Sequence, residues 1–116
     1  MSATDPIELG RRMHDAFNNR DFDAVGEIFA PDFYSHPLDA GRDAVRSAWE
    51  AMAGMYPEVF TAIDDIFADG DRVALRSTVH GMAENGQTAT IVEIFRVADG
   101  RIAELWGARG IPAGAA

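Results

Sequence analysis

Residues 91–106, IVEIFRVADGRIAELW, decide the fold because they predict two strands joined by a tight turn. An Asp-Gly pair between runs of alternating apolar residues is a strong hairpin signal, since both turn positions tolerate positive φ. Asp99 and Gly100 occupy those two positions here. The C-terminal part of the chain is therefore expected to end in a β-hairpin.

Three helices are predicted ahead of the strands. The first begins with Asp5 as its N-cap, has a proline in its first turn and ends near residues 18–19. A short second helix is expected from residues 21–23, where an aspartate can cap it, until Pro31 stops it. An extended segment over residues 33–39 follows. Apolar residues at spacings of three and four then predict a third helix over residues 41–55.

The remaining sequence predicts four strands, over residues 59–68, 72–82, 88–97 and 101–108, separated by turns rich in Asp, Asn and Gly. Helices followed by consecutive hairpins are typical of an α+β fold with a mainly antiparallel sheet. The 116 residues are long enough for one domain, 1–116, with one core. The small-residue tail over about residues 110–116 is expected to be frayed.

Composition excludes several classes of function. A net charge of -9 disfavours nucleic-acid binding, which draws on clustered cations. The absence of cysteine and lysine removes thiol and Schiff-base chemistry. The sequence has no metal-ligand spacing and no nucleotide-binding motif, so no metal and no cofactor are expected. Because it has neither a signal-peptide pattern nor an apolar run long enough to span a membrane, a cytoplasmic location is expected.

Residues 33–39, FYSHPLD, complete a pattern of three helices, this segment, and hairpins that end on Trp106. The pattern resembles the SnoaL-like polyketide cyclases of the NTF2-like superfamily over nearly the whole chain. The resemblance implies a cone in which a strongly bent sheet wraps the long helix and leaves an apolar cavity. It also implies a homodimer that pairs through the outer face of the sheet, and a hydrophobic small-molecule ligand.

Histidine is the first candidate for acid/base chemistry because its ordinary pKa lies near neutrality. The resemblance places Tyr34 and His36 at the cavity mouth, with His36 as the leading acid/base and Tyr34 as a donor to an oxyanion. The alternative for His36 is a structural hydrogen bond to a loop carbonyl. His14, one position off the apolar stripe of the first helix, is expected to be a surface or boundary residue.

Three further polar residues lie on predicted strands. Arg76 and His80 share one strand face, which is either solvated or lines a polar part of the pocket; the resemblance favours the pocket. Glu93 shares a face with apolar residues, and burial there would raise its pKa and suit it to act as a general base or acid. The alternative for Glu93 is an ion pair with Arg76 or Arg96 across the strands.

The pocket wall is predicted from large side chains on the third helix and the strands. Catalytic roles are expected for His36, Tyr34, His80 and Glu93, and substrate contacts for Trp49, Met52, Tyr56, Phe60, Arg76, Phe95 and Trp106. The family commonly carries an acid/base aspartate shortly after the tryptophan, and this chain has none between Trp106 and its end. Two hypotheses follow. One is a cofactor-independent enzyme that cyclises, isomerises or hydrates a polyketide-like or steroid-like molecule, and the other is a non-catalytic binding or dimerisation module.

Overall fold

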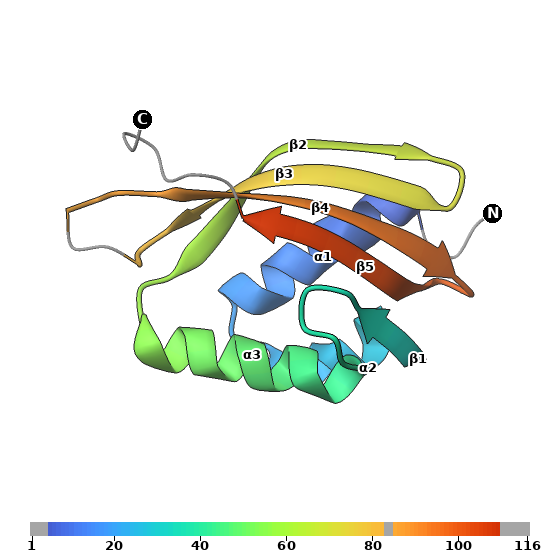
Figure 1. The fold of residues 1–116 in the computed structure, drawn as a ribbon, viewed down its shortest axis with the longest axis horizontal. Helices are drawn as coiled ribbons and strands as arrows, with labels where there is room; N and C mark the ends of the chain where they lie inside the picture. Colours follow the sequence, from blue (N-terminus) through green and yellow to red (C-terminus); the bar gives the residue numbers. More distant parts are fainter. Residues whose placement is uncertain (1–4, 83–84, 110–116) are drawn as a thin grey trace.

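The structure is a computed structural model that describes residues 5–82 and 85–109. Three helices and a short 3-10 turn pack against one face of a five-stranded sheet (Figure 1). No helix in the described part of the chain is long and apolar enough to cross a membrane. The elements, in chain order, are α1 (Pro6–Asn18), η1 (Phe22–Ala24), α2 (Val25–Ile28), β1 (Phe29–Ser35), α3 (Arg42–Met55), β2 (Phe60–Asp69), β3 (Arg72–His80), β4 (Ala89–Ala98) and β5 (Arg101–Arg109).

The sheet has the order β1-β5-β4-β3-β2, and three of its four pairings are antiparallel. Asp99 and Gly100 connect β4 to β5 with φ values of 53° and 76°, so both turn positions have the positive φ that this type of hairpin requires. The α+β class, the mainly antiparallel sheet and the C-terminal hairpin are therefore confirmed. The expected tail over residues 110–116 lies outside the described residues.

Helix α1 begins and ends where its sequence signals predict. The Asp5 carboxylate accepts a hydrogen bond from the backbone N–H of Ile7 at 2.9 Å, and the helix ends at Asn18. Gly10 allows α1 to approach the sheet closely, because a Cβ at that position would lie 2.9 Å from Ile66 Cδ1 and 3.2 Å from Phe95 Cζ. This close approach places the next turns of α1 directly against the strands.

The second helix is shorter than predicted, and the strand that follows it begins earlier. Helix α2 ends at Ile28, and Phe29 is already extended, so Pro31 does not end the helix but lies inside β1. A proline is tolerated there because β1 is an edge strand, whose outer N–H groups need no partner in the sheet. Strand β1 pairs with β5 in parallel. The sequence predicted an extended segment over residues 33–39 but not this pairing.

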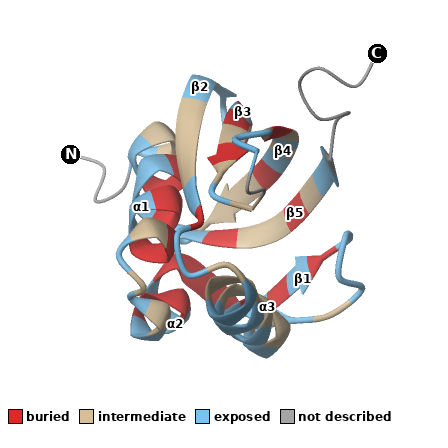
Figure 2. Cartoon of the chain, turned by 90° about the vertical axis from the view of Figure 1, so that its left-hand side faces the viewer, coloured by how far each residue is buried: buried red, intermediate tan, exposed pale blue. Residues whose placement is uncertain are grey.

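The sheet curves around the helices, and buried residues lie between them (Figure 2). We call the sheet face toward the helices the inner face and the opposite one the outer face. On β3, the residues at odd positions are buried on the inner face, whereas those at even positions point outward. The main core cluster gathers α1, α2 and the strands around Phe29 and Phe95, and a second, smaller cluster lies near Val59 and Val79.

Candidate active site

A cavity of about 190 Å³ lies between α1, α3 and the inner face of the sheet. Its walls are mostly apolar, and the two ionisable side chains among its lining residues are His14 from α1 and Glu93 from β4. An apolar cavity with a small number of polar groups is the usual form of a small-molecule site. The lining residues are Met13, His14, Phe17, Ala48, Trp49, Met52, Val59, Thr61, Val79, Met82, Ile91 and Glu93.

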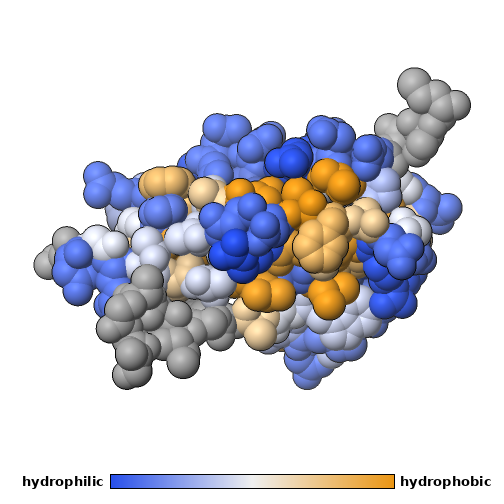
Figure 3. Space-filling view, turned by 90° about the horizontal axis from the view of Figure 1, so that it is seen from above, coloured by the Kyte–Doolittle hydropathy of each residue, from blue (hydrophilic) through white to orange (hydrophobic). Residues whose placement is uncertain are grey.

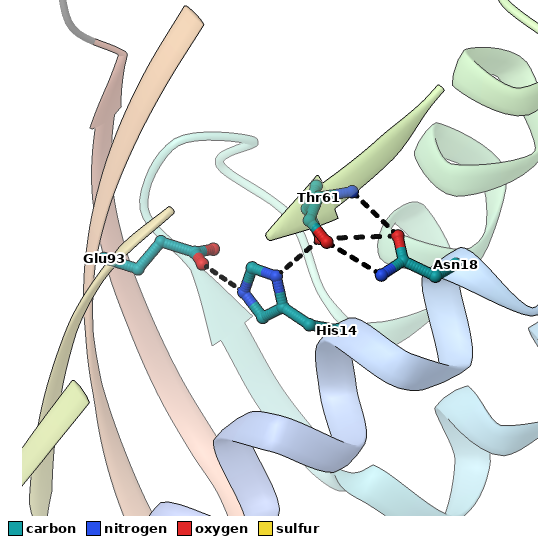
Figure 4. A network of polar contacts seen from close by, with 4 residues as sticks. All are labelled: His14, Asn18, Thr61 and Glu93. Atoms are coloured by element: carbon teal, nitrogen blue, oxygen red, sulfur yellow. Dashed lines mark hydrogen bonds and ion pairs between the residues drawn. The ribbon is translucent and has the colours of Figure 1, made fainter. Parts of the chain in front are cut away.

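His14 and Glu93 both line this cavity, and their side chains point toward each other and form a pair (Figure 4). The imidazole Nε2 lies 3.1 Å from Glu93 Oε1, and only 10% of the histidine side chain and 18% of the glutamate side chain are exposed. Little water can screen a charge or compete for a hydrogen bond at such a position. The pair is therefore placed to hold and to pass a proton.

Thr61 holds the other side of the imidazole. Its hydroxyl oxygen lies 2.7 Å from His14 Nδ1, and its backbone is fixed by Asn18, which accepts from Thr61 N–H and donates to Thr61 C=O, both at 2.8 Å. The hydroxyl can donate to Nδ1 of a neutral imidazole. It can also accept from Nδ1–H of an imidazolium and donate to Asn18 Oδ1, which lies 3.4 Å away. Both protonation states of His14 therefore keep their hydrogen bonds.

Glu93 keeps one carboxylate oxygen free. Oε1 is engaged by His14, whereas Oε2 has no hydrogen bond or ion pair with any of the described residues. The alternative in which Glu93 pairs with Arg76 or Arg96 is wrong. Arg76 pairs instead with Asp65, and Arg96 with Glu104. Glu93 lies on the inner face, as its apolar neighbours in the sequence predicted.

The expectation that His14 lies at the surface or at the boundary of the core is wrong, because the residue is only 8% exposed. The buried side of α1 is wider than the apolar stripe on which the prediction relied, which consists of Leu9, Met13, Ala16 and Phe17. Gly10 is buried as well, and His14 follows it by four positions, so the two residues form a second row beside that stripe. The spacing from Gly10 through His14 to Phe17 is the signal that would have identified this histidine.

Among the residues expected to contact substrate, the structure places Trp49 and Met52 in the cavity wall. Phe95 does not reach the cavity, because it is fully buried in the main core cluster. Tyr56, which follows the last turn of α3, packs against the smaller core cluster and is not part of the wall. A substrate contact thus stays a prediction for Trp49 and Met52.

Four of the expected site residues lie on the outer face instead. Phe60 and His80 stack there with ring centroids 4.7 Å apart, and Arg76 Nε donates to Asp65 at 2.7 Å. Trp106 shares this face, since it pairs with the exposed Ile94. The alternation of residues along the strand did not decide whether Arg76 and His80 face the solvent or the pocket. They lie on the face away from the pocket, because buried residues occupy the inner positions of β3.

Tyr34 and His36 also lie outside the cavity. Strand β1 runs parallel to β5 and pairs Tyr34 with Glu104, so both side chains point to the outer face. His36 Nε2 lies 2.7 Å from Glu104 Oε2, and the imidazole stacks on Trp106 at 4.9 Å. The Tyr34 hydroxyl donates to Asp39, and this hydrogen bond raises the pKa of Tyr34. The position at the cavity mouth that the resemblance implied is therefore corrected.

The contact between His36 and Glu104 leads to a testable prediction about the pKa of Glu104. The hydrogen bond from His36 lowers the pKa of Glu104, and Arg96 adds to this effect against the smaller opposing effect of burial. Because the folded pKa lies below the unfolded one, the pair stabilises the fold above the unfolded pKa and loses this effect as the pH falls through the folded pKa. We expect His36→Phe to raise the pKa of Glu104 in a carboxyl ¹³C NMR titration. His80→Phe is the matched control, and an unchanged Glu104 pKa in His36→Phe would contradict the assignment.

The described residues contain no group of three or more histidine or carboxylate side chains that could hold a metal ion. The candidate site therefore consists of His14, Glu93, Thr61 and Asn18 against an apolar wall. These residues can provide a base, an acid and the hydrogen bonds that orient them.

Comparison with known proteins agrees with this architecture. The sequence matches the SnoaL-like domain family over residues 10–105, which include every residue that lines the cavity. The chain belongs to the SnoaL-like domain family. No curated protein matches the sequence of this SnoaL-like chain.

Several solved structures are similar to the SnoaL-like chain. IdmH from Streptomyces antibioticus, a candidate polyketide cyclase, is 25% identical, with a TM-score of 0.81 over 90% of this chain and 91% of that one. A candidate polyketide cyclase from Sinorhizobium meliloti is 28% identical, with a TM-score of 0.75 over 87% and 94% of the two chains. A SnoaL-like polyketide cyclase from Agrobacterium tumefaciens is 13% identical and supports the fold alone, with a TM-score of 0.83 over 94% and 93%.

Proposed function

We propose that this SnoaL-like protein is a cofactor-independent acid/base enzyme that removes or relocates a proton next to a carbonyl group of a hydrophobic, ring-bearing molecule. The observation that carries the proposal is the buried pair of Glu93 and His14 in an apolar cavity, with one carboxylate oxygen free of protein partners among the described residues. A base that is shielded from water and oriented by a second group is suited to proton abstraction from carbon.

In the proposed reaction, Glu93 is the base. The C–H bond next to the substrate carbonyl breaks, the proton moves to Glu93 Oε2, and the electron pair of that bond moves into an enolate. His14 donates to Oε1 and keeps the carboxylate oriented, and Thr61 accommodates either protonation state of the imidazole. Return of the proton from Glu93 to another carbon gives isomerisation. In cyclisation the enolate carbon attacks a second carbonyl and forms the new C–C bond, and the alkoxide that results takes the proton back from Glu93.

The position of Gly107 supports a carboxylate at this place. Gly107 follows Trp106 directly and so lies within the short stretch after the tryptophan where the family resemblance implies an aspartate, and it pairs with Glu93 across β4 and β5. A Cβ at Gly107 would lie 3.7 Å from Glu93 Cγ. Glu93 therefore projects from the neighbouring strand close to the place that a side chain at position 107 would take. We infer that it substitutes for the missing aspartate.

Proton exchange tests this function without knowledge of the natural substrate. In D₂O, the protein is expected to accelerate the loss of the ¹H NMR signals of the protons next to the carbonyl of 2-tetralone, a ketone with two fused rings. His36→Phe, which changes a histidine on the outer face, is expected to retain this acceleration. Binding of 2-tetralone without any acceleration over buffer would contradict the enzyme and favour the alternative of a non-catalytic carrier.

We also propose that the outer face of the sheet pairs two copies of the chain. Apolar side chains gather in the middle of this face and are surrounded by hydrophilic ones (Figure 3). We define the outer-face patch as Phe60, Phe67, Val92 and Ile94, which are 43–64% exposed. The arginines near it are paired with carboxylates, so the face is locally balanced although the protein carries a charge of -9. Both features favour contact with an identical surface.

This dimer predicts that Ile94→Arg dissociates the protein. Sedimentation velocity is expected to give about twice the 12.6 kDa mass of one chain for the natural sequence and a single chain for the variant, because a buried unpaired guanidinium opposes association. Met55→Arg, an exposed position on α3, is the matched control and should leave the dimer intact. A monomeric natural protein, or a dimeric Ile94→Arg variant, would contradict the proposed interface.

A further inference from the structure

The charge of the cavity restricts which molecules can enter it. Its ionisable lining residues are Glu93 and the imidazole of His14, which is already engaged by Glu93; the lining contains no arginine, and the sequence contains no lysine. Arg20 is the cation beside Phe17, with its guanidinium carbon 5.4 Å from the ring centroid, but it already donates to the backbone carbonyls of Phe17, Pro57 and Val59. A carboxylate or phosphate in the cavity would lose its water and meet a like charge.

The volume of the cavity restricts the size of the ligand. The volume of about 190 Å³ lies below the usual range of ligand pockets. About two fused rings fill such a space. A tetracyclic molecule would leave much of its apolar surface outside or would have to displace the walls.

The walls favour a flat ring. Phe17 and Trp49 meet edge to face with centroids 5.7 Å apart, and both line the cavity together with the thioethers of Met13, Met52 and Met82. Aromatic edges and methionine side chains adapt well to the faces of a ring. The polar lining groups Thr61, His14 and Glu93 are joined to one another by hydrogen bonds and therefore lie together in one part of the wall.

We infer that the cavity takes an uncharged molecule of about two fused rings with one carbonyl group, and that it excludes carboxylates and tetracyclic molecules. This inference rests on the proposed function, and it narrows the expected polyketide-like or steroid-like ligands to small neutral ketones. Glu93 is the group that rejects anions, and the space between α1, α3 and the sheet sets how much of a ligand can be buried.

Matched probes test the inference. Binding is followed through the two indole N–H signals in ¹H–¹⁵N NMR spectra, because Trp49 lines the cavity whereas Trp106 lies on the outer face and serves as an internal control. We expect 2-tetralone to shift the Trp49 signal alone. Tetralin-2-carboxylate and the tetracyclic ketone progesterone should each bind more than about tenfold more weakly, since juxtaposed like charges and poor fit are both unfavourable.

The variant Glu93→Gln identifies the cause of the charge selection. It should narrow the difference in affinity between 2-tetralone and the carboxylate, and an unchanged difference would overturn the role of Glu93 in rejecting anions. Equal or tighter binding of the carboxylate or of progesterone to the natural protein would overturn the inference itself. A different result would contradict the proposed function alone: 2-tetralone binds in preference to the carboxylate, but its protons exchange no faster than in buffer.

Discussion

Glu93→Gln is expected to slow the exchange of the protons next to the carbonyl of 2-tetralone by about 10²–10⁴-fold. The amide keeps the size of the carboxyl group and can still accept from His14, but it cannot take a proton from carbon. The measurement is the rate of deuterium incorporation in D₂O, compared at ligand concentrations that saturate each protein. A rate within a few-fold of the natural protein would contradict the role of Glu93 as the base.

Two further variants separate the chemistry from the fold. His14→Phe keeps an aromatic ring but removes both imidazole nitrogens, so it should slow exchange by a smaller factor than Glu93→Gln. Gly107→Asp combined with Glu93→Gln places a carboxyl group on the opposite position of β5, where a Cβ meets only ordinary van der Waals contacts. We expect this double variant to recover part of the lost exchange, whereas Gly107→Asn with Glu93→Gln should recover none.

Phe95→Ala is expected to lower the free energy of unfolding by about 3–5 kcal/mol. Phe95 is fully buried at the centre of the main cluster, and its ring lies against the position of Gly10 on α1. Removal of the ring leaves a void between α1 and the sheet that the closely packed backbone cannot fill by collapse. The expected loss is a large part of the stability of an ordinary domain of this size.

Urea unfolding, followed by circular dichroism, measures this loss. Met55→Ala is the matched control, because Met55 is 67% exposed at the end of α3 and its removal should change the free energy of unfolding by less than about 0.5 kcal/mol. Equal stabilities of Phe95→Ala and the natural protein would contradict the central place of Phe95 in the core.

The elements that the sequence predicted well are those with strong local signals. The Asp99-Gly100 turn, the Asp5 cap of α1 and the apolar spacing of α3 each depend on neighbouring residues, and each is confirmed. The start of β1 was missed because the pairing of β1 with β5 joins segments far apart in the chain. The residues around Pro31 contain no local pattern that indicates this pairing.

The candidate site was only partly predictable for the same reason. Glu93 was placed on the inner face from its apolar neighbours, and Trp49 and Met52 from the stripe of α3. Alternation gives two faces for each strand but does not say which one the helices cover, so Phe60 and His80 were assigned to the wrong face. His14 was missed because its partners, on β2 and β4, are distant in sequence.

We propose that the ligand enters the cavity lined by His14 and does not bind beside His36 on the outer face of the sheet. The most direct test follows the ring signals of the three histidines by NMR while 2-tetralone is added. We predict that the signals of His14 shift with the ligand and that those of His36 and His80 do not, because only His14 lines the cavity. A shift of the His36 or His80 signals while those of His14 stay unchanged would contradict this proposal and place the ligand on the outer face of the sheet.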